Sequence, residues 1–344
     1  MKILFDMANR SDLVCINLYD LLAQEMAKIA DVKMWGPKRE GFVREPLEAT
    51  IKRLYGNDSP DWIITTAFML AEDRRWFDFV APPKEKRPWR IATFTSDIHA
   101  NHMIGADVVG YAQALNKANF DAILMLYTHV AYSKRPTRAI DPQYYLKNLK
   151  GTVYHCPIWV DSNLFKPSKE PPLYDVSFLA AFDSRQHPVR YSIWTELPAL
   201  AQENKWDVLM RMRPPGKSNT RFIDKMKAEG HVVGDVYADA LARSRVFIFG
   251  SSIYKYPLLK IVEGWMAGAC VVCDEPFTAK RMHMADGENY IKVDVNNWKT
   301  KLKEILNNEP KRKMIAQKGY ETAIKYHTPQ VRVRELLSFL EKNR

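Results

Sequence analysis

Residues 245–274 read RVFIFGSSIYKYPLLKIVEGWMAGACVVCD, and this stretch predicts a β-α-β unit. Residues 245–249 form a short apolar run with β-branched and aromatic side chains, which indicates a strand. Pro257 suits the first turn of a helix, where its missing N–H has no intrahelical partner, and Gly268 suits the C-terminal cap. Residues 269–273 are a continuous apolar run, which is typical of a parallel strand covered on both faces.

Such a unit predicts a ligand site, because ligands of open parallel sheets bind beyond the carboxyl ends of the strands. We expect residues 250–256 to line that crevice, with Ser251, Ser252, Lys255 and Tyr256 as candidate binding residues. The start of the helix presents backbone N–H groups that suit phosphate. Helical side chains lean toward the N-terminus, so the carboxylate of Glu263 can reach back and accept hydrogen bonds from a ribose diol. The alternative is a solvated helix glutamate, or one paired with a lysine.

Four segments resemble one known family. Residues 260–276, KIVEGWMAGACVVCDEP, look like the E-A-x-A-x-G-x-P-V-V segment of GT-B glycosyltransferases, closest to the family-4 (group 1) type and its spore-maturation-protein-like branch. Residues 286–290, DGENY, are similar to the family's D-G-E-N segment. Residues 158–167 resemble its G-V-D-x-x-x-F-x-P interdomain segment, and residues 174–182 resemble the first strand of its C-terminal domain. The order and spacing of the four are those of the family.

The resemblance implies an α/β fold of GT-B architecture: two Rossmann-like domains facing across a cleft, with a C-terminal helix returning to the first domain. It implies that Glu263 holds the donor ribose. In the family a basic pair at spacing five binds the donor pyrophosphate, and Arg185 and Arg190 match that spacing. The chain departs from the family at Lys255, where a second glutamate is usual; this lysine is a candidate phosphate contact.

Other basic residues have competing interpretations. Arg185 and Arg190 are alternatively surface arginines at a helix N-terminus, and Arg211 and Arg213 are further candidates for phosphate. Residues 216–218, Gly-Lys-Ser, do not form a P-loop, because Arg211 stands where its first glycine would be. Residues 231–233 are predicted to be a short strand beside the nucleotide base.

The first half of the chain contains the candidate residues for binding the acceptor. Residues 90–95 indicate a strand that is followed by Ser-Asp-Ile-His-Ala-Asn-His, so Asp97 and His99 are candidate catalytic residues that orient or deprotonate an acceptor hydroxyl. The alternative for Asp97 is a helix cap. Arginines and aromatics are mixed in residues 74–90, a composition typical of a single-strand or flipped-base surface, or of a surface loop packed by its own aromatic rings.

Length, composition and charge narrow the range of protein classes to which the chain can belong. The 344 residues are enough for two domains, and a net charge of +11 favours anionic partners such as nucleotide phosphates, nucleic acid or an anionic membrane surface. There is no apolar run of membrane-spanning length, and the N-terminus lacks the features of a signal peptide. The four cysteines predict no disulfide framework, and the Cys270–Cys273 pair lies on a predicted buried strand, so we expect no metal and a cytoplasmic protein.

We therefore expect an acceptor-side domain at residues 1–167, a nucleotide-sugar-binding domain at 168–329 and a returning helix at 330–344. The predicted function is metal-independent, retaining transfer of a sugar from a nucleotide-diphosphate donor, which is a cosubstrate rather than a cofactor. DNA carrying a modified base is the leading acceptor, whereas a protein or a small metabolite would also fit. Two alternatives are a non-catalytic nucleic-acid-binding protein on a GT-B scaffold and a nucleotide-sugar epimerase.

Overall fold

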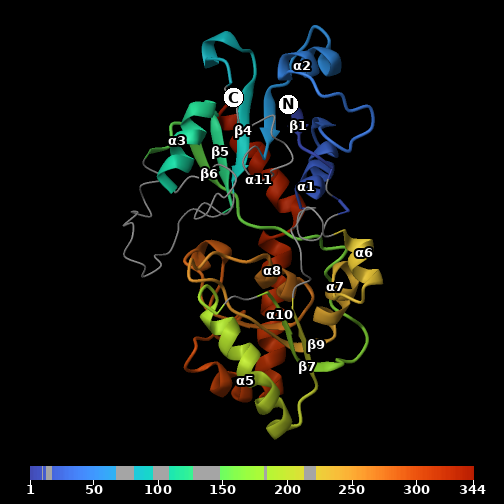
Figure 1. Ribbon diagram of the computed structural model, residues 1–344, viewed down its shortest axis with the longest axis vertical. Coiled ribbons are helices and arrows are strands. Elements are labelled where there is room, and N and C mark those ends of the chain that lie inside the picture. The colour runs from blue at the N-terminus through green and yellow to red at the C-terminus, as the bar shows by residue number, and fades with distance from the viewer. Residues whose placement is uncertain are drawn as a thin grey trace. The chain divides into compact units, whose positions relative to one another are not determined.

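The computed structural model describes residues 1–9, 11–12, 18–66, 81–95, 108–126, 148–181, 184–212 and 222–344. The chain divides into two compact units (Figure 1). Unit 1 contains Met1–Ser11, Tyr19–Pro157 and Pro329–Arg344, and unit 2 contains Asp12–Leu18 and Ile158–Thr328. In the described part of the chain, no helix is both long enough and apolar enough to cross a membrane.

Unit 1 contains, within its described residues, a six-stranded parallel sheet in the order β2-β1-β3-β4-β5-β6. Every residue of the inner strands β3 and β5 is buried, as expected for a parallel sheet covered on both faces. The strands are β1 (Lys2–Asp6), β2 (Asp31–Trp35), β3 (Trp62–Thr65), β4 (Arg90–Thr95), β5 (Ala122–Met125) and β6 (Thr152–His155).

The last helix of the chain packs on unit 1 and confirms the predicted return of the C-terminus. Leu336 and Leu340 of this helix are fully buried, and the Trp62 indole donates a hydrogen bond of 3.1 Å to the Leu340 carbonyl. The rings of Tyr154 and Phe339 stack at 4.5 Å. The helices of unit 1 are α1 (Leu18–Ala27), α2 (Leu47–Tyr55), α3 (Val108–Ala118) and α11 (Pro329–Lys342), with the short 3-10 turn η2 (Lys84–Lys86).

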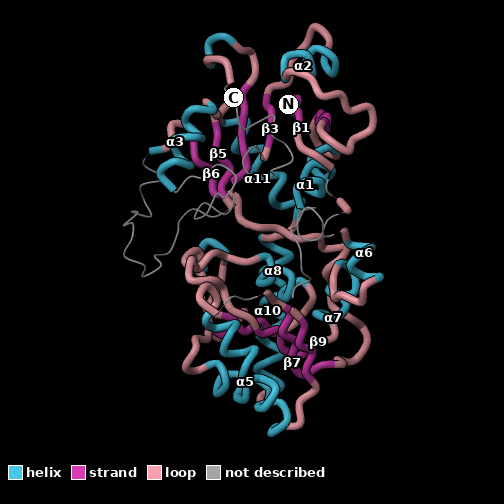
Figure 2. The backbone as a smooth tube through the Cα atoms, in the orientation of Figure 1, coloured by secondary structure: helices cyan, strands magenta, loops and turns pink. Residues whose placement is uncertain are grey.

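Unit 2 contains a second parallel sheet, in which the described strands have the order β11-β10-β9-β7-β8 (magenta in Figure 2). The predicted β-α-β unit is present as β9, α8 and β10, and these elements occupy the middle of the domain. The strands are β7 (Tyr174–Leu179), β8 (Val208–Arg211), β9 (Ser244–Ile248), β10 (Cys270–Cys273) and β11 (Ile291–Lys292).

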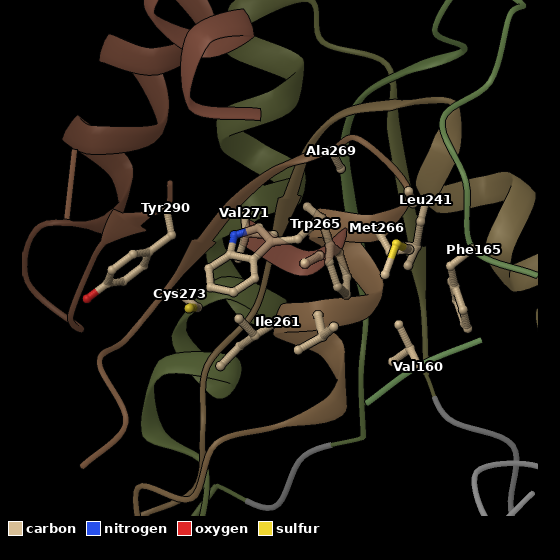
Figure 3. Close-up of a cluster of buried hydrophobic side chains, with 14 of the residues drawn as sticks. Val160, Phe165, Leu241, Ile261, Trp265, Met266, Ala269, Val271, Cys273 and Tyr290 are labelled. Atoms are coloured by element: carbon tan, nitrogen blue, oxygen red, sulfur yellow. The ribbon is translucent and has the colours of Figure 1, made fainter. Parts of the chain in front are cut away.

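Two apolar cores lie on opposite faces of this sheet. One, shown in Figure 3, is centred on Trp265 of α8. Trp265 is completely buried and donates a hydrogen bond of 2.6 Å to the Asn289 carbonyl. The other packs α5 and α9 against the opposite face, around the buried Trp298. The helices are α5 (Pro188–Asn204), α6 (Ile223–Ala228), α7 (Gly234–Ala242), α8 (Leu259–Met266), α9 (Trp298–Asn307) and α10 (Glu309–Tyr326), with the 3-10 turn η4 (Ala279–Met282).

Two expectations differ from the structure. Residues 158–167, predicted to end the first domain, cluster with unit 2, because Ile158, Val160 and Phe165 are buried in the Trp265 core. Residues 231–233 are not a strand: the His231 N–H donates to the Met226 carbonyl at the end of α6, and Val233 precedes α7. This short segment therefore connects two helices and adds no strand to the sheet.

Candidate functional site

The loop between β9 and α8 is anchored by a buried carboxylate. Asp274 follows β10 and is 4% exposed. Its Oδ1 accepts a hydrogen bond of 2.5 Å from the Ser251 N–H, and its Oδ2 accepts one of 2.7 Å from the Ser251 hydroxyl. The Lys255 ammonium also pairs with Oδ2. Both ends of the turn 251–255 are thereby tied to the carboxyl end of β10.

The turn itself is compact. The Ser252 carbonyl accepts the Lys255 N–H at 2.9 Å, and the Ser252 hydroxyl accepts the Tyr254 N–H at 3.3 Å. Lys255 has φ of +51°, in the left-handed region, and the following Tyr256 is buried with its ring stacked 6.0 Å from that of Tyr254. The Lys255 side chain is 35% exposed, so its ammonium faces solvent on one side while Asp274 holds the other.

Arg190 is a buried residue that joins two loops. It lies in the first turn of α5, its Nε donates to the Gly250 carbonyl, and its Nη1 donates to the Ala181 carbonyl, both at 2.5 Å. Gly250 also approaches α5 closely: a Cβ there would lie 2.7 Å from the Cβ of Val189. The Arg190 cation therefore lies at the α5 N-terminus, between the segments that follow β7 and β9.

The remaining predicted cations are more exposed. Arg185 lies in the exposed turn just before α5, and Arg211 is the exposed last residue of β8, with its Nη1 donating to the Met210 carbonyl at 2.8 Å. The predicted site residues Asp97, His99 and Arg213 lie outside the described residues.

Glu263 is half-buried on α8, and its carboxylate contacts Tyr237 of α7. The Tyr237 hydroxyl donates a hydrogen bond of 2.8 Å to Glu263 Oε2. The Lys260 ammonium, one helical turn before Glu263, lies 3.4 Å from the Tyr237 hydroxyl oxygen and 5.0 Å from the centre of its ring. Among the described residues, Glu263 Oε1 has no hydrogen-bond partner.

Burial shifts the pKa of this carboxylate in one direction, and its charged and hydrogen-bonding neighbours shift it in the other. Removal from water raises the pKa of Glu263, whereas the Lys260 charge and the Tyr237 hydrogen bond lower it. A carboxylate with one oxygen held and the other without a described partner is able to accept a hydrogen bond from a ligand hydroxyl. The Tyr237 hydrogen bond distinguishes Glu263 from a freely solvated glutamate, and the influence of the Lys260 charge agrees with the alternative of a glutamate beside a lysine.

Sequence reasoning missed three contributors to this region: Asp274, Tyr237 and Lys260. Lys260 carried a detectable signal, because residues three apart on a helix are neighbours. Asp274 directly follows a predicted strand, at the sheet edge where ligands bind. Tyr237 had no such signal, because its partner is 26 residues away on another helix.

The Cys270–Cys273 pair is not a metal or redox site. Cys270 belongs to the Trp298 core and Cys273 to the Trp265 core, so the two thiols lie on opposite faces of the sheet. Burial raises the pKa of the Cys270 thiol to about 12 and that of Cys273 well above its usual value. Elsewhere in the described ranges, no group of three His, Cys, Asp or Glu side chains is placed to hold a metal ion.

Comparison with known proteins shows the class of this fold and domain. Residues 177–338 match the family described as "Glycosyl transferase-like". No curated protein sequence matches the chain. The match places a glycosyltransferase-like domain in the C-terminal half of the chain, and the fold is that of GT-B glycosyltransferases.

Three solved structures illustrate the likeness over the full chain. Sucrose-phosphate synthase of Thermosynechococcus elongatus is 13% identical, covers 99% of both chains and superposes with a TM-score of 0.62. HepE of Anabaena, solved with UDP and glucose, is 12% identical, with 99% of both chains covered and a TM-score of 0.59. An alpha-glucosyltransferase solved with UDP and a 13-mer DNA is 12% identical, with 99% of both chains covered and a TM-score of 0.56. At these identities the likeness is one of fold.

Proposed function

We propose that the protein transfers a sugar from a nucleoside-diphosphate donor that binds at the carboxyl edge of the unit 2 sheet. The observation that carries this proposal is Glu263, whose Oε2 is held by Tyr237 while Oε1 has no partner among the described residues. Oε1 accepts a hydrogen bond from a ribose hydroxyl of the donor. The UDP bound in two of the similar structures supports a nucleotide ligand of this kind.

The donor diphosphate lies at the N-terminus of α5. Backbone N–H groups and the helix dipole favour an anion there. The Arg190 cation is fixed at this end of the helix by two carbonyls, and Arg185 lies in the turn before it. Negative charge develops on the diphosphate as the glycosidic bond breaks, so fixed cations stabilise the transition state. The carboxyl edge of the unit 2 sheet is also lined by five further residues that we propose bind the donor: Lys255, Ser251, Ser252, Tyr256 and Arg211.

Calorimetry with UDP tests the role of Glu263. Glu263→Gln keeps the shape of the side chain but removes a charge-assisted hydrogen bond, which is worth about 1.5–3 kcal/mol, or roughly ten- to a hundredfold in affinity. Glu321→Gln, an exposed change on α10, is the matched control and leaves the affinity unchanged. Equal UDP affinity of wild type and Glu263→Gln, with both folded, would refute the proposed donor site.

A panel of nucleotide sugars, with and without acceptors, tests the reaction. We propose that turnover requires an acceptor, persists in EDTA because arginines neutralise the leaving group, and retains the anomeric configuration of the sugar. NMR of the product reports that configuration. An isomerised donor formed without any acceptor would instead show an epimerase. The motif at residues 260–276 supports placing the protein in the spore-maturation-protein-like branch.

We propose DNA carrying a hydroxymethylated base as the acceptor, with Asp97 and His99 of the N-terminal half orienting its hydroxyl. The net charge of +11 supports a polyanionic partner, and one structure of similar fold was solved with DNA. Radiolabelled sugar should enter modified duplex DNA and leave unmodified duplex of the same sequence unlabelled. Labelling of neither, with transfer to a protein or small metabolite, would rule out the DNA acceptor. Salt-dependent DNA binding without donor binding would indicate a non-catalytic scaffold.

A further inference from the structure

Tyr237 lies between the two charged side chains of α8 that face α7. Its hydroxyl oxygen is 2.8 Å from Glu263 Oε2 and 3.4 Å from the Lys260 ammonium. An ammonium group can only donate hydrogen bonds, and an ionised carboxylate can only accept them. The tyrosine hydroxyl therefore accepts from Lys260 and directs its own proton to Glu263, so the chain of hydrogen bonds has one direction.

The tyrosine ring is itself fixed on two sides. Phe165 contacts it edge-on at 6.0 Å, and the Lys260 ammonium lies over its face at 5.0 Å. Glu263 and Lys260 are three residues apart and therefore share a helix face. Among the described contacts, the 2.8 Å hydrogen bond from Tyr237 of α7 is the one by which a neighbouring helix holds the Glu263 carboxylate in place. Rotation of the carboxylate about its terminal bond would break that hydrogen bond.

We propose that Tyr237 is a positioning residue for the donor site: it holds Glu263 Oε2 and thereby presents Oε1 to a ribose hydroxyl, while Lys260 fixes the direction of the tyrosine O–H. This inference rests on the proposed function and adds to it the residues that prepare the carboxylate. A half-buried carboxylate with rotational freedom would have to be ordered on binding, and preorganisation removes that cost from the affinity.

The same arrangement acts on the protonation of Glu263. Lys260 of the same helix acts on it through its charge and Tyr237 of α7 through its hydrogen bond, and both lower the pKa that burial raises. Donor binding through Oε1 uses the ionised form, so affinity falls as the pH drops through the pKa of Glu263. Removing the Tyr237 hydroxyl raises that pKa further, so the fall begins at a higher pH.

The decisive variant is Tyr237→Phe, which keeps the ring and its contacts with Phe165 and Lys260. We expect UDP affinity at neutral pH to fall about five- to tenfold, which is less than for Glu263→Gln, because the hydrogen bond from the ribose to Glu263 is weakened but not removed. We also expect the loss of affinity on acidification to begin at a higher pH than in wild type. Tyr320→Phe, which alters another half-buried tyrosine packed against the same core, is the control and should change neither quantity.

A double-mutant cycle separates positioning from a general structural effect. In a Glu263→Gln background, Tyr237→Phe should cause little further loss of UDP affinity, because the carboxylate it positions is absent. Lys260→Met tests the contact between Lys260 and the Tyr237 hydroxyl. In this variant too, the loss of UDP affinity on acidification should begin at a higher pH than in wild type, and this test does not depend on whether Tyr237→Phe folds well. The outcomes are distinguishable: unchanged UDP binding by Glu263→Gln overturns the proposed function. Weakened binding by Glu263→Gln, with wild-type affinity and pH profile for Tyr237→Phe and Lys260→Met, overturns this inference alone.

Discussion

The imidazole of His327 lies 3.0 Å, through Nδ1, from the backbone oxygen of Ile158, a residue 169 positions earlier in the chain. Its Nε2 lies 3.1 Å from the Met282 carbonyl, and its own carbonyl accepts the Val160 N–H at 3.1 Å. The ring is 1% exposed. His327 thus joins the first residues of the main segment of unit 2 to its last residues.

Replacing His327 should destabilise unit 2. A neutral imidazole donates from one of its two nitrogens, so His327→Leu leaves one of these buried carbonyl oxygens without its donor. We expect the free energy of unfolding to fall by about 1–3 kcal/mol, the cost of an unsatisfied buried acceptor, in urea melts followed by tryptophan fluorescence. His231→Leu, at a half-buried histidine between α6 and α7, is the control. Equal effects of the two changes would show that the carbonyl contacts are energetically unimportant.

Gly319 is expected to be intolerant of a methyl group. A Cβ at this position of α10 would lie 2.5 Å from Cδ1 of Trp265, and overpacking of this kind costs about 1–3 kcal/mol. Gly319→Ala should therefore lower the midpoint of urea unfolding. The cost should shrink in a Trp265→Phe background, since the smaller ring gives space. Identical costs in both backgrounds would place the strain elsewhere.

A glutamate at position 255, which is usual in the glycosyltransferases that the sequence resembles, should destabilise this protein. Lys255→Glu places a carboxylate beside the buried Asp274, whereas Lys255→Met only removes the ion pair. We expect Lys255→Glu to unfold at lower urea than Lys255→Met, by about 1 kcal/mol after allowing for the partial exposure of the lysine. Because the difference comes from Asp274, it should vanish in an Asp274→Asn background. A more stable Lys255→Glu would contradict the ion pair.

The described cysteines should be unreactive in the folded protein. Burial raises the pKa of Cys156 and of Cys270 to about 12, and that of Cys273 well above its usual value, so almost no thiolate is present at pH 8. In a Cys15→Ser variant, DTNB should label no thiol without denaturant and three after unfolding. Rapid labelling of one thiol before unfolding would mean that the surrounding core opens readily.

Periodicity predicted the local elements of this protein well. The predicted strand at residues 90–95 matches β4 without a shift, and the β-α-β unit at residues 245–274 appears as β9, α8 and β10. The failures have a common cause. Residues 231–233 include two β-branched valines but connect two helices. Residues 158–167 belong to unit 2 because their side chains pack against residues far along the chain.

The sequence by itself determined the alternation of strands and helices, the parallel sheets that follow from it, and the position of Glu263 on the helix after β9. These depend on side-chain spacing along the chain, which is a local property. Only the tertiary structure decided what each charged side chain contacts. Glu263 accepts a hydrogen bond from Tyr237, Lys255 forms an ion pair with Asp274, and Arg190 donates hydrogen bonds to two backbone carbonyls. Such contacts join residues that are distant in sequence, and no local pattern encodes them because packing between elements brings the partners together.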